Sequence, residues 1–198
     1  MTTQRISLFQ QHVMRWKDCT KCLLHMCRQK VVLARGTIPC DLLFIGEAPG
    51  NSEDVVGRPF CGPAGKLLDT IIERGVAGRC TVALTNLVCC IPLGEDGAKV
   101  TEPDAVDIHS CSTRLNEFVH ICQPKGIVCV GALPKRHIIG QAQFERDGQP
   151  ITWIPDGKFM EFIEITHPAA ILRNPVAQHI AVQRCVARLR EISLRITE

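Results

Sequence analysis

Apolar residues follow two alternating patterns along the chain. The first is a short continuous apolar run closed by glycine or a polar residue, which is typical of a buried strand. Such runs predict strands at 42–45, 82–88, 127–130 and 162–165, with a further extended segment at 151–154. The second pattern places apolar residues three or four positions apart, which predicts helices at 7–18, 64–75, 104–122 and 176–192 and a weaker one at 134–139.

This alternation indicates the fold class. Strands that alternate with helices form a parallel sheet covered by helices on both faces. We therefore expect an α/β fold, a three-layer α/β/α sandwich around a mostly parallel four-stranded sheet. No internal repeat, low-complexity tract or linker interrupts the 198 residues, so we expect one domain over 1–198.

Three polar segments fall at the ends of predicted strands, namely 46–50, 85–86 and 167–168. In open α/β sheets, ligands bind in the crevice at the carboxyl ends of the strands. These segments are therefore predicted to meet at one site.

Composition constrains the partners only weakly, because a formal net charge of +3 neither favours nor excludes nucleic acid. No apolar run approaches the roughly 20 residues of a membrane helix, and the first residues lack the apolar segment of a signal peptide. We therefore expect a cytoplasmic protein. In a reducing compartment its 12 cysteines are metal ligands, core residues or nucleophiles rather than disulfide partners.

Residues 46–65 carry the most specific information. They are rich in glycine and proline, which fix an irregular backbone, and acidic side chains lie among them. Together with two later segments they give four motifs in order: GEAPG at 46–50, GRPF-x-G-x-AG at 57–65, TN-x-V at 85–88 and HPAA-x-LR at 167–173. With these motifs the chain resembles the family 4 uracil-DNA glycosylases, which carry an iron–sulfur cluster. The resemblance extends from Cys19 to the C-terminal helix.

The resemblance implies a DNA-repair hydrolase whose partner is uracil-containing DNA. Such an enzyme flips uracil out of the helix, hydrolyses its N-glycosidic bond and leaves an abasic site. The chemistry needs a bound base, a positioned water and stabilisation of the leaving uracil anion. We expect a monomer that acts without strand cleavage.

Two residues are implied as catalytic. Glu47, in GEAPG, resembles the carboxylate that positions or deprotonates the water, although a surface acid in a tight turn is the alternative. His167 resembles the residue that donates a hydrogen bond to the uracil oxygen that gains charge. The other histidines have no such setting and are interpreted as surface or helix residues.

The substrate pocket is implied by further motif positions. Phe60 resembles the aromatic ring on which the base stacks, and Asn86 the amide that pairs with the Watson–Crick edge of uracil. A core phenylalanine and an asparagine that satisfies backbone groups are the alternatives. The resemblance adds three further substrate-binding positions, Gly46, Ala48 and Glu53. Leu172 and Arg173 resemble the loop that inserts into DNA, with Leu172 in the gap left by the base and Arg173 on phosphate.

The cysteines include a C-x-x-C pair, and the resemblance implies two more ligands. Cys19, Cys22, Cys90 and Cys111 would hold a [4Fe-4S] cluster, although zinc accepts the same ligands. Cys89 is an alternative to Cys90 as the third ligand. The chain departs from the family pattern here, since a longer and more acidic loop at 91–99 replaces a basic, proline-rich stretch.

Two hypotheses compete with catalysis. A related branch of the superfamily binds uracil-DNA covalently or without turnover, but it carries GEQPG and a basic loop with a histidine, whereas this chain has Ala48 and no such loop after Asn86. A zinc-stabilised scaffold without activity is the third hypothesis. Basic residues near the first cysteine pair would form a phosphate-binding patch or an ordinary solvated surface: Arg15, Lys17, Lys21, Arg28, Lys30 and Arg35.

Overall fold

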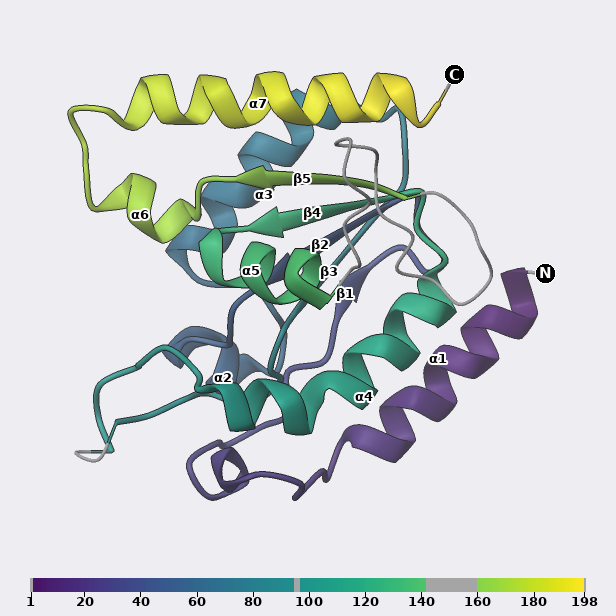
Figure 1. The fold of residues 1–198 in the computed structure, drawn as a ribbon, viewed down its shortest axis with the longest axis vertical. Coiled ribbons are helices and arrows are strands. Elements are labelled where there is room, and N and C mark those ends of the chain that lie inside the picture. Colours follow the sequence, from purple (N-terminus) through teal and green to yellow (C-terminus); the bar gives the residue numbers. More distant parts are fainter. Residues whose placement is uncertain (1, 95–96, 142–159, 198) are drawn as a thin grey trace.

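The computed structural model describes residues 2–94, 97–141 and 160–197. Its sheet has the strand order β1-β3-β2-β4-β5 and lies between two layers of helices (Figure 1). The three contacts among β2, β3, β4 and β5 are parallel, and only β1 pairs antiparallel with β3. The strands are β1 (Arg35–Gly36), β2 (Leu42–Gly46), β3 (Val82–Asn86), β4 (Gly126–Val130) and β5 (Glu161–Ile165).

The predicted α/β sandwich is confirmed, but the sheet has five strands rather than four. The additional strand is β1, whose two residues are too few to show a periodicity in the sequence. Gly36 has φ +110°, and a Cβ there would meet the carbonyl oxygen of Val82, so this edge pairing depends on glycine. The extended segment predicted at 151–154 lies outside the described residues.

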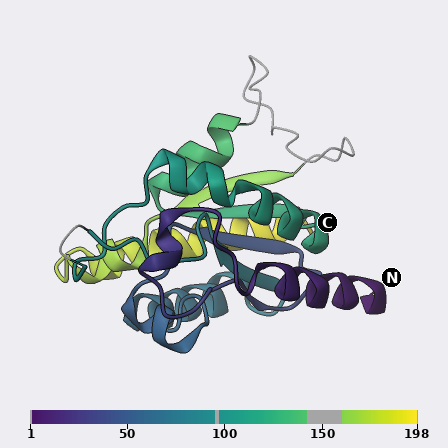
Figure 2. The same cartoon turned by 90° about the horizontal axis from the view of Figure 1, so that it is seen from below.

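The five predicted helices are confirmed with shifted ends, and three short helical segments were not predicted. Figures 1 and 2 show α3, α6 and α7 on one side of the sheet and α1, α4 and α5 on the other. None of the described helices has the length and hydropathy of a membrane-spanning segment. The helices are α1 (Thr2–Trp16), η1 (Leu23–Met26), α2 (Asn51–Val56), α3 (Pro63–Val76), α4 (Ala105–Cys122), α5 (Ala132–Gln141), α6 (Pro168–Leu172) and α7 (Gln178–Arg195).

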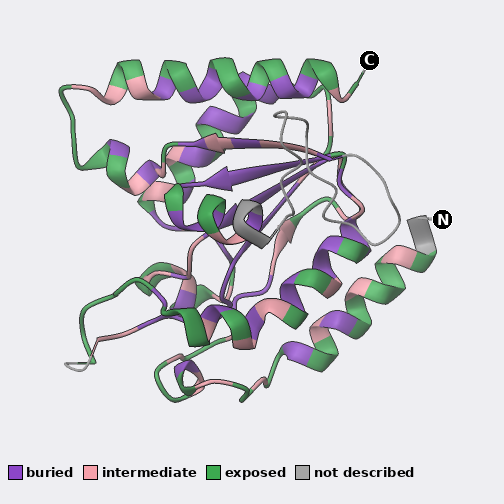
Figure 3. Cartoon of the chain, viewed as in Figure 1, coloured by how far each residue is buried: buried purple, intermediate pink, exposed green. Residues whose placement is uncertain are grey.

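The core has two halves because successive strand residues point to opposite faces of the sheet. On β2, Leu43 and Ile45 pack with residues of α1 and α4, whereas Leu42 and Phe44 pack with residues of α3 and α7. The strands β2, β3 and β4 are buried almost throughout, and the outer faces of α1 and α7 are exposed (Figure 3). Continuous apolar runs, rather than alternating ones, are therefore the expected pattern for these strands.

Candidate active site

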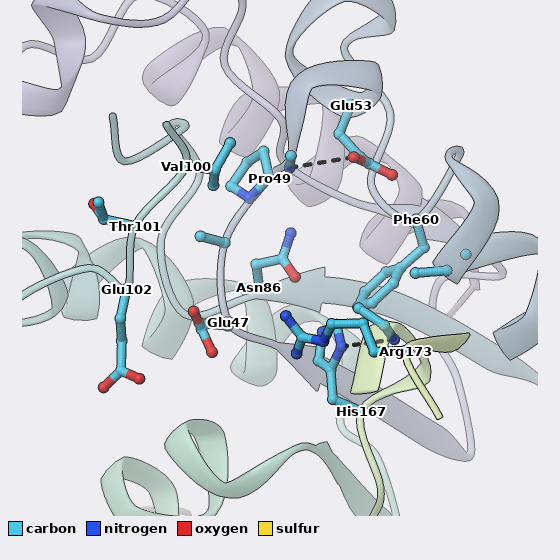
Figure 4. Close-up of a pocket in the computed structure, with 15 residues that line it drawn as sticks. Glu47, Pro49, Glu53, Phe60, Asn86, Val100, Thr101, Glu102, His167 and Arg173 are labelled. Atoms are coloured by element: carbon cyan, nitrogen blue, oxygen red, sulfur yellow. Dashed lines mark hydrogen bonds between the residues drawn. The ribbon is translucent and has the colours of Figure 1, made fainter. Parts of the chain in front are cut away.

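A cavity of about 530 Å³ lies at the carboxyl ends of β2 and β3 and beside the start of α6 (Figure 4). The register Gly46↔Asn86 places the ends of β2 and β3 side by side. The predicted meeting of the three polar segments is thus confirmed. Residues predicted for the site that line this cavity are Glu47, Ala48, Glu53, Phe60, Asn86, His167 and Arg173.

Glu47 lies in the loop that leaves β2. The loop is held against the chain after β3, because Leu87 N–H donates to the Gly46 carbonyl (2.9 Å) and Val88 N–H to that of Glu47 (3.2 Å). Burial raises the pKa of Glu47, the charge of Glu102 adds to this effect, and Arg136 and Arg173 oppose it. Figure 4 shows both carboxylates in the same cavity. Glu47 is therefore a partly desolvated acid rather than a surface acid.

Phe60 is held in an unusual backbone conformation, with φ +54°. Arg35 fixes it: its Nε donates to the Pro59 carbonyl (2.8 Å) and its Nη2 to the Phe60 carbonyl (3.3 Å). A Cβ on Gly46 would meet the Phe60 ring and the Asn86 side-chain oxygen, so glycine lets the ring and the amide approach each other. Gly46 thus shapes the cavity from beneath without lining it.

Gly65→Ala tests how firmly Phe60 must be placed. An added Cβ would collide with the carbonyl group of Phe60, so the helix start or the Phe60 turn must move. We expect a loss of about 1–3 kcal/mol in the free energy of unfolding together with weakened ligand binding in the cavity. Gly78→Ala is the control, since its positive φ of 73° is strained in alanine but nothing lies within 4 Å of the new Cβ. If Gly65→Ala and Gly78→Ala bound a ligand in the cavity equally well, binding would not depend on the placement of Phe60.

Asn86 ends β3 and is 2% exposed. Its backbone carbonyl accepts a hydrogen bond from Arg114 Nη2 at 2.6 Å. Its side-chain amide has no hydrogen-bonding partner in the described part of the chain and faces the cavity in Figure 4. An asparagine that satisfied backbone groups would instead use its amide for them, so a ligand is the better partner.

His167 is the N-cap residue of α6. Its Nδ1 accepts the backbone N–H of Ala169 at 3.2 Å, so in the neutral ring the hydrogen is on Nε2. Burial and, second, the positive charge of Arg173 lower the pKa of His167. The arrangement supplies a neutral hydrogen-bond donor in the cavity.

Glu53 lines the cavity, but its carboxylate oxygens are engaged within the protein. They accept from Gly50 N–H at 3.2 Å and from Gly62 N–H at 2.8 Å. The side chain thereby joins the two glycine-rich loops that carry Glu47 and Phe60. The hydrogen bonds of Glu53 therefore hold these two loops together.

Val100, Thr101 and Glu102 form one wall of the cavity, and sequence reasoning did not assign them to the site. A bridge between Leu93 and Val100 brings this loop back on itself. Glu102 forms an exposed ion pair with Arg136 of α5 at 3.3 Å. The only sequence signal near this wall was the unusual length and acidity of 91–99. It did not show that the loop folds towards the cavity.

The two residues that were predicted to contact DNA lie at the end of α6. Leu172 is 37% exposed and lies outside the cavity, whereas the exposed Arg173 also contributes to the cavity wall. An exposed apolar residue next to a cation at the mouth suits contact with a DNA helix.

A second, smaller cavity is lined by five cysteines, Cys19, Cys22, Cys89, Cys90 and Cys111. Cys89 Sγ lies 3.6 Å from Cys111 Sγ, and Arg28 Nη1 donates to Cys90 Sγ at 3.4 Å. No group of three or more His, Cys, Asp or Glu side chains among the described residues is arranged to hold a single metal ion. Thiols from three separate segments thus line one cavity, but they do not converge on the position of a single ion.

Several of the basic residues near the first cysteine pair have partners within the protein. Arg15 pairs with Glu117 (3.1 Å), Lys21 lies over the Trp16 ring, and Arg35 binds the carbonyls before and at Phe60. Arg28 points at Cys90. A common role for all six residues in phosphate binding is therefore not supported.

Comparison with known proteins places these features in a family. A family profile described as "Uracil DNA glycosylase superfamily" matches residues 34–190. The type-4 uracil-DNA glycosylase of Sulfurisphaera tokodaii is 32% identical, covering 89% of this chain and 81% of its own length. Those of Pyrobaculum aerophilum and Thermotoga maritima are also 32% identical, with 80% and 81% of this chain and 82% and 81% of their own length covered. The chain therefore belongs to the uracil-DNA glycosylase superfamily, and within it to the type-4 branch.

Proposed function

We propose that this protein is a monofunctional uracil-DNA glycosylase that releases uracil from DNA and leaves an abasic site. The observation that carries the proposal is that an aromatic ring, an unpaired amide, a desolvated carboxylate and a neutral imidazole line one cavity: Phe60, Asn86, Glu47 and His167. Family membership supports the same reaction, since the related proteins are named uracil-DNA glycosylases.

Recognition of uracil follows from the ring and the amide. The flipped base would stack on Phe60, and such stacking is worth about 1–3 kcal/mol. The Asn86 amide would donate to uracil O4 and accept from N3–H, a hydrogen that cytosine lacks. The close approach of both side chains to Gly46, where a Cβ would leave no room, supports a preformed pocket.

Hydrolysis then requires the bond between C1′ and N1 to break with its electron pair on uracil. The Nε2–H of His167 would stabilise the negative charge that develops on the uracil oxygen. Glu47, when ionised, would orient a water towards C1′, accept its proton and favour the cationic sugar. No lysine lines the cavity among the described residues, so a Schiff base, and with it strand cleavage, is not expected.

Contact with DNA would use the end of α6. We propose that Leu172 fills the space left by the flipped base and that Arg173 contacts phosphate. The exposure of Leu172 next to the cavity mouth supports this role.

Incubation with a labelled oligonucleotide that contains one deoxyuridine tests the proposal. Alkali-dependent cleavage is the expected result, because an abasic site breaks in alkali. Intact DNA would favour a binding protein without turnover, and a slow band that survives denaturation would indicate covalent capture. Ala48, at the position where the covalent branch has glutamine, supports turnover.

We further propose that Cys19, Cys22, Cys90 and Cys111 hold a [4Fe-4S] cluster. The donor set supports the proposal, since thiols from three separate segments line one cavity, and the cations Arg28 and Arg114 near it would offset thiolate charge. When bound, the cluster would fasten the N-terminal segment to the middle of the chain, without taking part in hydrolysis.

Cys90 is the better third ligand than Cys89. The hydrogen bond from Cys89, and then Arg28, outweigh burial and lower the pKa of Cys90. For Cys89, the hydrogen bond from Cys111 is outweighed by the contact with Cys90 and by burial, which raise the pKa to about 12. Arg28 Nη1 also donates to Cys90 Sγ at 3.4 Å, and a cation in that position stabilises the thiolate that a ligand must be.

Cys90→Ser should therefore lose most of the bound iron and lower the melting temperature, whereas Cys89→Ser should retain iron. Iron content and cluster absorbance of proteins purified without oxygen would measure the difference. The opposite ranking would assign the third ligand to Cys89.

A further inference from the structure

Arg114 of α4 occupies a singular position, because its whole side chain is buried (0% exposed) directly behind the base pocket. Its Nη1 donates to Thr85 Oγ1 at 2.8 Å, and its Nη2 donates to the carbonyls of Asn86 at 2.6 Å and Leu87 at 2.9 Å. Thr85 in turn donates to the Leu33 carbonyl at 2.7 Å. One guanidinium thus fixes the carboxyl end of β3, where the proposed base-reading amide is attached.

Further neighbours of Arg114 include three thiols. Cys111 lies one helical turn earlier on α4, and Cys89 and Cys90 follow β3. Among the described residues no carboxylate pairs with this buried cation, its Nε–H has no well-aligned acceptor, and the Cys111 thiol interacts with the guanidinium. Burying a charge without a counter-charge destabilises the folded state, and so does burying a donor without a good acceptor.

A four-thiolate cluster would remove both costs. Its ligand sulfurs carry negative charge, and they accept hydrogen bonds from nearby N–H groups. The Nε–H donor without a well-aligned acceptor and the uncompensated charge of Arg114 both suit such a neighbour. The planar guanidinium of arginine can donate to the oxygen acceptors at the end of β3 and to the cysteine sulfurs at the same time. The single ammonium group of lysine cannot reach both sets of acceptors in this way.

We propose that Arg114 is a positioning residue that couples the occupied cysteine cavity to the placement of Asn86 in the base pocket. The proposal rests on the proposed function, both for the role of Asn86 and for the cluster. Loss of the cluster would leave the Arg114 charge uncompensated and free the end of β3 to shift. Misplacement by about 1 Å can cost about 100-fold in rate.

Arg114→Lys tests the coupling, because it keeps the charge but not the planar guanidinium. We expect iron content near that of wild type, a lower reduction potential of the cluster because a hydrogen bond to sulfur is lost, and a single-turnover excision rate reduced about 100-fold. Discrimination between uracil-containing and undamaged DNA should weaken in parallel. Arg114→Met should lose iron as well. Val119→Ala, a buried change on the same helix, controls for general destabilisation.

Two results would overturn the proposal. A folded Arg114→Lys protein with wild-type rate and discrimination would show that the placement of Asn86 does not depend on Arg114. A wild-type reduction potential would show that the cluster does not interact with Arg114. If Arg114→Lys fails to fold, Thr85→Val removes one acceptor of the same guanidinium and should give a smaller loss in rate and discrimination. The absence of any loss in this variant would overturn the proposal. Should the wild-type protein not excise uracil, the proposed function fails, while iron content and potential still test the cysteine side.

Discussion

Replacing Glu47 with glutamine is expected to lower the single-turnover rate of uracil excision by about 100- to 10,000-fold, the usual contribution of a positioned acid or base. Glutamine has nearly the same shape, but it carries no charge to favour the cationic sugar and cannot accept a proton from water. Affinity for uracil-containing DNA should stay within a few-fold of wild type, because the contacts of the base are with Phe60 and Asn86. Rapid-quench kinetics and equilibrium binding would separate the two effects.

The matched control is Glu102→Gln, which makes the same chemical change at another carboxylate that lines the cavity. It should keep most of the excision rate, because no role in the reaction is assigned to Glu102. An unchanged rate in Glu47→Gln would remove Glu47 from the mechanism. Equal losses in both variants would mean that the charge of the cavity, and not the position of Glu47, matters.

The pH dependence gives an independent check on Glu47. Burial and the charge of Glu102 raise its pKa, and the proposed mechanism needs the ionised form. Activity should therefore fall on acidification at a higher pH than for an ordinary glutamate, whose pKa is about 4.3. In Glu102→Gln one of the two causes is removed, so the acidic limb of the profile for kcat/KM should move to lower pH. A limb that does not move would show that another group controls it.

Most of the residues singled out from the motifs line the cavity, because local backbone geometry and side-chain chemistry are encoded in the same short segments. Gly46 and Gly65 are examples, since each permits a close approach to Phe60 that any side chain would block. The alternation of apolar patterns likewise predicted the order of the main strands and helices. Four of the five strands were found in this way because buried parallel strands are continuously apolar.

Features that depend on contacts between distant segments were not predictable. β1 is a strand only because Arg35 and Gly36 pair with Leu84 and Ala83. Glu102 joins the cavity wall through the path of a loop that has no periodicity. Arg114 read as one more polar residue on a helix, and its burial behind Asn86 follows from how α4 packs on the sheet.

Asn86→Asp is expected to lower uracil excision at least about 100-fold, since facing two acceptors against each other in a buried site costs more than the about 1–3 kcal/mol of a missing hydrogen bond. An ionised aspartate can still accept from uracil N3–H, but it has no hydrogen to donate to O4. The amino group of cytosine, in contrast, could donate to the new carboxylate. The ratio of uracil to cytosine release should therefore fall by more than a general loss of activity would produce.

The control for this change is Asn116→Asp, the same substitution at an exposed position of α4. Rates on oligonucleotides that carry a single uracil or a single unpaired cytosine would be compared for both variants and wild type. If Asn86→Asp behaved like Asn116→Asp, the amide would have no part in reading the base. If it lost activity on uracil with an unchanged ratio, the amide would matter for the shape of the pocket only. A fall in the ratio would assign base recognition to the side-chain amide itself, whose position the backbone contacts with Arg114 maintain.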